Sequence, residues 1–388
     1  MLTTIVLFVL ILGLLIFVHE FGHFVAARKM GAKVEEFGMG FPPRIFGVYR
    51  NKNGKWGKLW GNAEPKLDAP TVYSLNWLPI GGFCKIKGED DSGNQDSDSF
   101  AKKKIWQRAL ILIAGVTMNV LLAMVLLIIG FKVGLPVAIE DGIPTDQIRD
   151  RKVQIMAVSE NSPAAAAGIQ MGDQILSVAG QPVDQANRIQ DITRDYQDRE
   201  MVIEIKRGEE KRELSLVPRS EFSDGDGPVG ISLVEVGIVS YPWYQALTKG
   251  AVATFALLVA IVVALFNIIK NLLVGAGVAE ELSGPVGIAV MTGQMARMGY
   301  VYILQFIAIL SINLAIINLF PLPALDGGRL IFLALEKIRG KKVERKLENT
   351  IHMIGFILLL LLMLAVTFRD VFKFQDIFVN IGKRIIGQ

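Results

Sequence analysis

Long apolar runs constrain the fold of this chain more than any other feature. Four stretches have the length that a transmembrane helix needs, about 20 residues: Thr4 to Ala27, Ala109 to Phe131, Val301 to Phe320 and Asn349 to Phe368. A fifth run, Ala251 to Leu273, is borderline. The hydrophobic share of 52% over 388 residues is too high for an ordinary soluble protein. The sequence therefore predicts a polytopic α-helical membrane protein with about four transmembrane helices.

Basic residues are concentrated in two of the segments between these runs. The stretch from Ala27 to Arg108 holds 15 Lys or Arg, and Gly327 to Asn349 holds seven. The stretch from Gly134 to Gln245 holds 11 basic and 19 acidic residues. Because loops rich in Lys and Arg tend to stay in the cytoplasm, we expect the first two on the cytoplasmic side and the third on the opposite side. Orientation alone explains the basic loops, so no nucleic-acid partner is expected.

Two polar regions between the runs carry strand-like patterns. In residues 32–104, Gly, Pro and aromatic residues predict short strands and turns with too little apolar mass for an independent core. We expect a membrane-associated, β-rich cytoplasmic loop there. In residues 134–235, an Ala-rich helix that ends at Gly168 and a helical pattern at 184–196 alternate with strands, which predicts an inserted α/β domain. The predicted strands are 153–158, 174–178, 201–206 and 211–217.

Ionisable residues stand inside the first apolar run. His19, Glu20 and His23 form an H-E-x-x-H pattern, which on a helix turns both imidazoles to one face and places the carboxylate beside them. Zinc with three protein ligands lowers the pKa of water in its open position, and a neighbouring carboxylate can accept that water's proton. Such groups are costly in a span unless they are paired or ligating. This favours a peptidase site over a chance match or a structural metal site.

A third protein ligand is required, and two residues are candidates. Asp326 follows two prolines that end the third long run, and His352 stands at the start of the fourth. A carboxylate completes a known zinc set of two histidines and one acid, so Asp326 is preferred. Asp326 can reach the histidines only if the third long run travels toward the cytoplasm. We therefore expect residues 251–273 to lie in the interface, to re-enter, or to pair with the short segment after them.

Two motifs resemble those of the site-2 protease family of intramembrane zinc proteases. His19 to His23 is similar to the family's H-E-x-x-H, and Asn318 to Gly327 is similar to its N-x-x-P-x-P-x-L-D-G. Ser162 to Leu176 resembles the PDZ domains of bacterial proteases. Together these features resemble the regulator-of-sigma-E protease subgroup, here with a single PDZ domain. The resemblance implies a zinc ion bound by His19, His23 and Asp326, with Glu20 as the general base.

The resemblance also implies substrate contacts and a class of substrate. Asn318 is expected to bind the substrate backbone. Asn119, in a G-x-x-x-N pattern that begins at Gly115, is the second expected substrate-binding residue, with ordinary helix packing as the alternative. The family acts in the bacterial cytoplasmic (inner) membrane. It cuts transmembrane segments of proteins such as anti-sigma factors or signal-peptide remnants, often after an upstream site-1 protease.

Two other function classes compete with the protease. One is a non-catalytic membrane scaffold that binds partners through its PDZ domain and has a structural metal site, and the other is a divalent-cation transporter. Glu20 and the complete ligand set weigh against the scaffold, and the scarcity of ionisable residues in the second and fourth runs weighs against the transporter.

These predictions divide the chain into seven segments. They are a first transmembrane helix with H-E-x-x-H (1–31), the β-rich cytoplasmic loop (32–104), a second transmembrane helix (105–133), the extracytoplasmic PDZ domain (134–235), an interfacial or re-entrant helical segment (236–299), a third transmembrane helix with N-x-x-P-x-P-x-L-D-G (300–330), and a cytoplasmic loop, fourth transmembrane helix and amphipathic tail (331–388).

Overall fold

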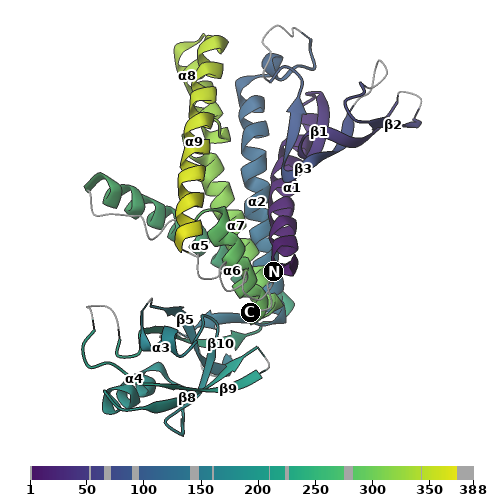
Figure 1. Cartoon of the computed structure of the whole chain (residues 1–388). Helices are drawn as coiled ribbons and strands as arrows, with labels where there is room; N and C mark the ends of the chain where they lie inside the picture. Colours follow the sequence, from purple (N-terminus) through teal and green to yellow (C-terminus); the bar gives the residue numbers. More distant parts are fainter. Residues whose placement is uncertain are drawn as a thin grey trace. The chain divides into compact units, whose positions relative to one another are not determined.

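The chain forms two compact units, seen here in a computed structural model (Figure 1). The first unit comprises Met1–Val125, Val252–Val290 and Ile307–Gln388, and the second comprises Leu126–Ala251 and Met291–Phe306. The structure describes residues 2–51, 54–64, 71–89, 96–139, 148–159, 161–208, 210–222, 227–274, 283–341 and 343–373. Most of the predicted C-terminal amphipathic tail therefore lies outside the described residues.

Five helices in the described part of the chain are long and apolar enough to cross a membrane. They are α1 (Leu2–Lys29), α2 (Ile105–Val133), α5 (Trp243–Val274), α7 (Tyr300–Leu319) and α9 (Arg345–Lys373). Four of them contain the four predicted long runs. The fifth, α5, contains the borderline run, and its 32 residues are enough to span a bilayer. The architecture is that of a multi-pass membrane protein, and by length and composition it has one more candidate span than predicted.

Contacts within the first unit bear on whether α5 makes a net crossing. The buried carboxylate of Asp370 on α9 accepts hydrogen bonds of 2.8 Å from the backbone N–H groups of Gly284 and Gly287, where α6 (Pro285–Met298) begins. His352 lies near the opposite end of α9, about 27 Å from Asp370 along the helix. Its Nδ1 accepts a 2.8 Å hydrogen bond from Ala324 N, in the turn before Asp326. The chain thus starts α6 at the end of α9 remote from the turn before Asp326. The placement of residues 251–273 and the count of four spans both remain predictions.

The β-rich loop folds as one small sheet beside α1 (Figure 1). Its strands are β1 (Val34–Arg50), β2 (Trp56–Trp60) and β3 (Val72–Ile86), in the order β2-β1-β3. Residues 36–39 of β1 pair with residues 72–75 of β3 on one side and with residues 82–85 of β3 on the other. Among the described residues, Gly82–Ile86 pairs with β1 alone, so this last run of β3 is an edge of the sheet.

This sheet shares its core with the helices, in agreement with its low apolar mass. Phe24 of α1, Ile111 of α2, Phe37 of β1 and Ile86 of β3 are buried in one cluster, which also includes Phe100 of the short 3-10 helix η1 (Phe100–Lys102). The Phe24 and Phe37 ring centroids are 5.2 Å apart. The shared core holds the edge run of β3 against the part of α1 that carries the histidines.

The second unit contains an antiparallel sheet with two short helices, as predicted for the inserted α/β domain. The strand order is β4-β10-β5-β6-β8-β9, and β7 pairs with β6. The elements are β4 (Leu135–Ala138), β5 (Ile148–Val158), α3 (Pro163–Ala166), β6 (Gln174–Val178), β7 (Gln181–Pro182), α4 (Ala186–Asp195), β8 (Met201–Arg207), β9 (Glu210–Leu216) and β10 (Ile231–Val239). All four predicted strands and both predicted helices are present.

Two predicted boundaries were wrong in their local structure. The domain boundary at 235 falls inside β10, which pairs with both β4 and β5 and so belongs to the sheet. The segment from 331, predicted as the start of a cytoplasmic loop, is helical because α8 (Asp326–Arg339) continues through it until Gly340 ends the helix with a φ of 64°. Leu333 of α8 is buried in the core that α1, α2 and the small sheet share.

Candidate metal centre

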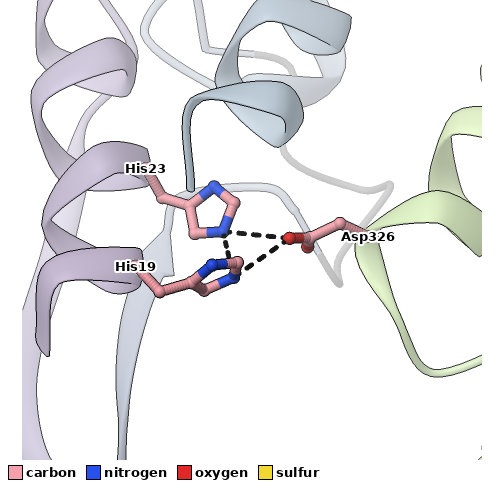
Figure 2. Close-up of side chains that lie close together, drawn as sticks. All are labelled: His19, His23 and Asp326. Carbon is pink, nitrogen blue, oxygen red and sulfur yellow. Dashed lines mark hydrogen bonds and ion pairs between the residues drawn. The ribbon is translucent and has the colours of Figure 1, made fainter. Parts of the chain in front are cut away.

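His19 and His23 point from one face of α1 toward Asp326, the first residue of α8 (Figure 2). Their Nε2 atoms are 3.1 Å and 3.2 Å from Asp326 Oδ2. The two Nε2 atoms are 3.1 Å from each other. Both imidazoles are buried. Residues about 300 positions apart in the sequence thus bring three ligand atoms together.

The turn before α8 explains how Asp326 reaches the histidines. After α7 ends at Leu319, the prolines prevent its continuation, and Ala324 takes a left-handed φ of 74°. Gly327 then packs against the end of α7. A Cβ added to Gly327 would lie 2.2 Å from the carbonyl oxygen of Leu319, so only glycine fits at this position. His352, the alternative ligand in the sequence, instead accepts the hydrogen bond from Ala324 N. It supports the turn that carries Asp326.

The three ligand atoms suit a zinc ion. In a tetrahedral zinc site with bonds of about 2.0–2.1 Å, neighbouring ligand atoms are about 3.3 Å apart, close to the separations seen here. His23 Nδ1 lies 2.9 Å from the carbonyl oxygen of Ile111. A carbonyl only accepts, so Nδ1 carries a proton, and in the neutral imidazole Nε2 then turns a lone pair toward His19 and Asp326. Lone pairs of the two Nε2 atoms and of the Asp326 carboxylate that converge in this way repel each other unless a cation lies among them. This set of three ligand atoms therefore fits a metal ion.

His19 is oriented by a buried amide. Asn119 of α2 is fully buried, and its Nδ2 lies 3.4 Å from His19 Nδ1. Among the described residues, Asn119 Oδ1 has no hydrogen-bond partner. A half turn of the Asn119 amide exchanges its oxygen and nitrogen. Asn119 Oδ1 then accepts a hydrogen bond from the Nδ1–H of His19, and the Nε2 of His19 is left free to bind a metal. The backbone carbonyl of Asn119 accepts a 2.8 Å hydrogen bond from Ser311 Oγ of α7, which fixes this part of α2.

Two glycines let α1 and α2 approach closely at the histidines. A Cβ on Gly22 would lie 2.4 Å from the carbonyl oxygen of Ala114. A Cβ on Gly115 would lie 2.5 Å from His23 Nε2 and 2.8 Å from His19 Cε1. Gly115 therefore makes room for both imidazoles. In the sequence, the G-x-x-x-N pattern indicated that Gly115 lies near the site. Ordinary helix packing explained the same pattern equally well.

Glu20 and Asn318 line the cavity beside the three ligands. The cavity has a volume of about 630 Å³, and its walls include α1, the end of α7, the start of α8 and the edge run of β3. Asn318 Nδ2 is 3.4 Å from His19 Nε2. The backbone of Gly82 lies against Glu20, since a Cβ on Gly82 would be 3.7 Å from Glu20 Cγ. Asn119, in contrast, is behind His19 and is not among the cavity residues.

Comparisons with known proteins point to one protein family. The sequence profile described as Peptidase family M50 matches residues 7–57 and 63–362. The zinc metalloprotease RasP of Geobacillus kaustophilus is 30% identical over 96% of this chain and 99% of its own length. The regulator of sigma-W protease RasP of Bacillus subtilis is 29% identical, with 95% of this chain and 98% of that protein covered. The regulator of sigma-E protease RseP of Escherichia coli is 31% identical, with 94% of this chain and 97% of that protein covered.

A solved PDZ domain of an SdrC-like protein from Listeria monocytogenes is 22% identical, covers 21% of this chain and 85% of that domain, and has a TM-score of 0.19. That likeness is too weak to carry an argument, whereas the profile spans both the histidine pair and Asp326. The chain belongs to peptidase family M50, the site-2 proteases, and is a zinc metalloprotease.

Proposed function

We propose that this protease cuts peptide bonds within transmembrane segments of other membrane proteins. In this proposal His19, His23 and Asp326 hold a zinc ion, and Glu20 is the general base. The observation that carries the proposal is the convergence of three buried ligand atoms beside Glu20, on a helix that is apolar enough to span a membrane. Ionisable groups in such a helix are expected to be functional.

The chemistry is the addition of water to a peptide carbonyl and the breaking of its C–N bond. When bound, zinc would polarise the carbonyl and make water more acidic. Glu20 takes a proton from the attacking water and later delivers it to the departing amine nitrogen. The products are a new carboxyl terminus and a new amino terminus. Asn119 and the Ile111 carbonyl hold the two imidazoles in the tautomers that leave both Nε2 atoms free.

The substrate must unwind before attack because a helix buries its carbonyls in internal hydrogen bonds. Freed backbone groups need new partners in a medium without water. We infer that the edge run Gly82–Ile86 supplies them by strand addition, since it lines the cavity and pairs with β1 on one side. Asn318, in the same cavity, would bind the substrate backbone. The buried position of Asn119 favours orientation of His19 over contact with substrate.

The small sheet carries three exposed tryptophans. Trp56, Trp60 and Trp77 are 64–68% exposed, and tryptophan is enriched where membrane and water meet. We infer that this sheet lies in the cytoplasmic interface, beside an active site near the same face. The distribution of basic residues favours that orientation, with the PDZ-like domain outside the cytoplasm.

The relatives, rather than the cavity, support a substrate class. Two relatives are named as regulators of sigma factors. We propose that this chain acts in a bacterial inner membrane on anti-sigma factors or signal-peptide remnants, after a site-1 protease has shortened the outer part of the substrate. The PDZ-like domain would restrict access by substrates with large outer domains.

The proposal is tested with purified full-length protein in liposomes. Wild type and Glu20→Gln are loaded with zinc and given a transmembrane peptide with a truncated outer part. We expect cleavage by wild type alone, with equal zinc content in the two proteins. Stoichiometric zinc without cleavage of several such peptides would refute the substrate class, and cleavage by Glu20→Gln would refute the assigned base.

A further inference from the structure

Helix α8 carries Asp326 and is held by charged and polar contacts to its neighbours. Glu336 of α8 forms an ion pair of 2.6 Å with Arg108 of α2, and both side chains are largely buried. His352 of α9 accepts the hydrogen bond from Ala324 N, in the turn just before α8. These two contacts connect α8 and its turn to other helices. Neither connects α8 to the small sheet.

A third contact makes that connection. Arg329 lies one turn beyond Asp326 on the same helix, so the two side chains share a face. The Arg329 guanidinium forms an ion pair with the Glu89 carboxylate. Glu89 lies three residues after the end of the edge run of β3, and its backbone N–H donates a 3.1 Å hydrogen bond to Ile86 O. Both side chains are partly buried, with 33% of Arg329 and 16% of Glu89 exposed.

The pair also stands at the boundary of two cavities. Arg329 and Glu89 line the active-site cavity together with Glu20, Asp326 and the edge run. They line, in addition, a neighbouring cavity of about 300 Å³ whose other charged residues include Arg108, Glu336 and Glu348. The ion pair therefore lies between the active-site cavity and a second, polar cavity. In such partly buried surroundings an ion pair is screened less than on an open surface.

We propose that Arg329 is a positioning residue for the substrate: through Glu89 it holds the edge run Gly82–Ile86 in register with Asp326. The inference rests on the proposed role of that run in strand addition. A peptide paired with the edge run presents a scissile carbonyl to the metal centre only if strand and α8 keep a fixed spacing. Small displacements of this kind reduce catalysis strongly. Apolar packing of Leu333 also joins α8 to the core that the small sheet shares, and the Arg329–Glu89 pair adds the charged contact that sets this spacing.

The test uses full-length Arg329→Gln, Arg329→Lys and Glu89→Gln proteins in liposomes. Arg339→Gln is the matched control, because Arg339 is an exposed arginine near the end of the same helix. Three quantities are measured: kcat and KM for a transmembrane peptide, zinc content, and backbone hydrogen exchange of residues 82–89. The last two require no substrate.

We expect Arg329→Gln and Glu89→Gln to lower kcat at least tenfold, because the scissile carbonyl is then held away from its productive position, with zinc content unchanged and faster exchange at 82–89. Arg329→Lys should retain most of the wild-type kcat, and Arg339→Gln should match wild type throughout. Unchanged kcat and exchange in Arg329→Gln would overturn the inference, as would zinc loss with unchanged exchange. If wild type cleaves no peptide, the proposed function fails, while the exchange experiment still decides whether the pair holds the strand.

Discussion

Gly115→Ala adds one methyl group at the point where α2 faces the two imidazoles. The new Cβ would lie 2.5 Å from His23 Nε2, which is 0.9 Å less than the 3.4 Å at which ordinary contact begins. It would also lie 2.8 Å from His19 Cε1. The nearby atoms are ring atoms of short side chains, and His23 is further held by the Ile111 carbonyl. Relief of the clash must therefore move the imidazoles or separate α1 from α2.

Metal ligands tolerate displacements of only about 0.2 Å, several times less than this clash requires. We expect Gly115→Ala to weaken zinc binding at least as much as loss of an outer hydrogen bond does, about 10–100-fold, and to lower cleavage in parallel. Zinc affinity is measured by competition with a chromogenic chelator in detergent. The control is Gly13→Ala on α1, where a Cβ meets nothing within 4 Å and alanine favours the helix by about 1 kcal/mol. Gly115→Ala with wild-type zinc affinity would refute the reasoning.

Three further predictions follow from single contacts. Asn119→Ala should weaken zinc binding about 10–100-fold by freeing His19 to rotate, and an unchanged affinity in the same chelator competition would contradict this. Asp370→Ala should destabilise the protein by about 1–3 kcal/mol, because it leaves the buried N–H groups of Gly284 and Gly287 without their acceptor; a thermal unfolding curve in detergent that matches wild type would rule this out. Burial raises the pKa of the Cys84 thiol, and the charges of Glu20 and Glu89 raise it further, so thiolate is scarce at neutral pH. Alkylation at pH 8, followed by mass spectrometry, should be much slower in the folded than in the denatured protein; equal rates would contradict the placement of Cys84.

The local parts of the site could be predicted from the sequence, because they depend on spacing along one helix. His19, Glu20 and His23 are such a set. Asp326 needed more: two prolines that end α7, the direction of the spans, and a resemblance to a family motif. The structure brings Asp326 to both histidines, as the topology argument required.

The contacts between helices could not be predicted in the same way. α1 and α7 are apolar on all sides, so their patterns do not indicate which face meets a neighbour. The closeness of Gly115 to the imidazoles and the hydrogen bond between Asn119 and His19 depend on how the helices are rotated about their axes. The pairing of Arg329 with Glu89 also depends on the register of β3, which folds back on β1 with several irregularities. Register of this kind arises from tertiary packing rather than from the strand sequence.

The most direct test of the central claim is the position of the cut and the origin of its oxygen. Zinc-loaded wild type and Glu20→Gln are incubated in H₂¹⁸O with a transmembrane peptide in liposomes, and the products are sequenced by mass spectrometry. The account predicts one cut inside the membrane-spanning segment by wild type alone, with a single ¹⁸O in the new carboxyl terminus. Cuts confined to the flanking loops, or the same cut by Glu20→Gln, would contradict it.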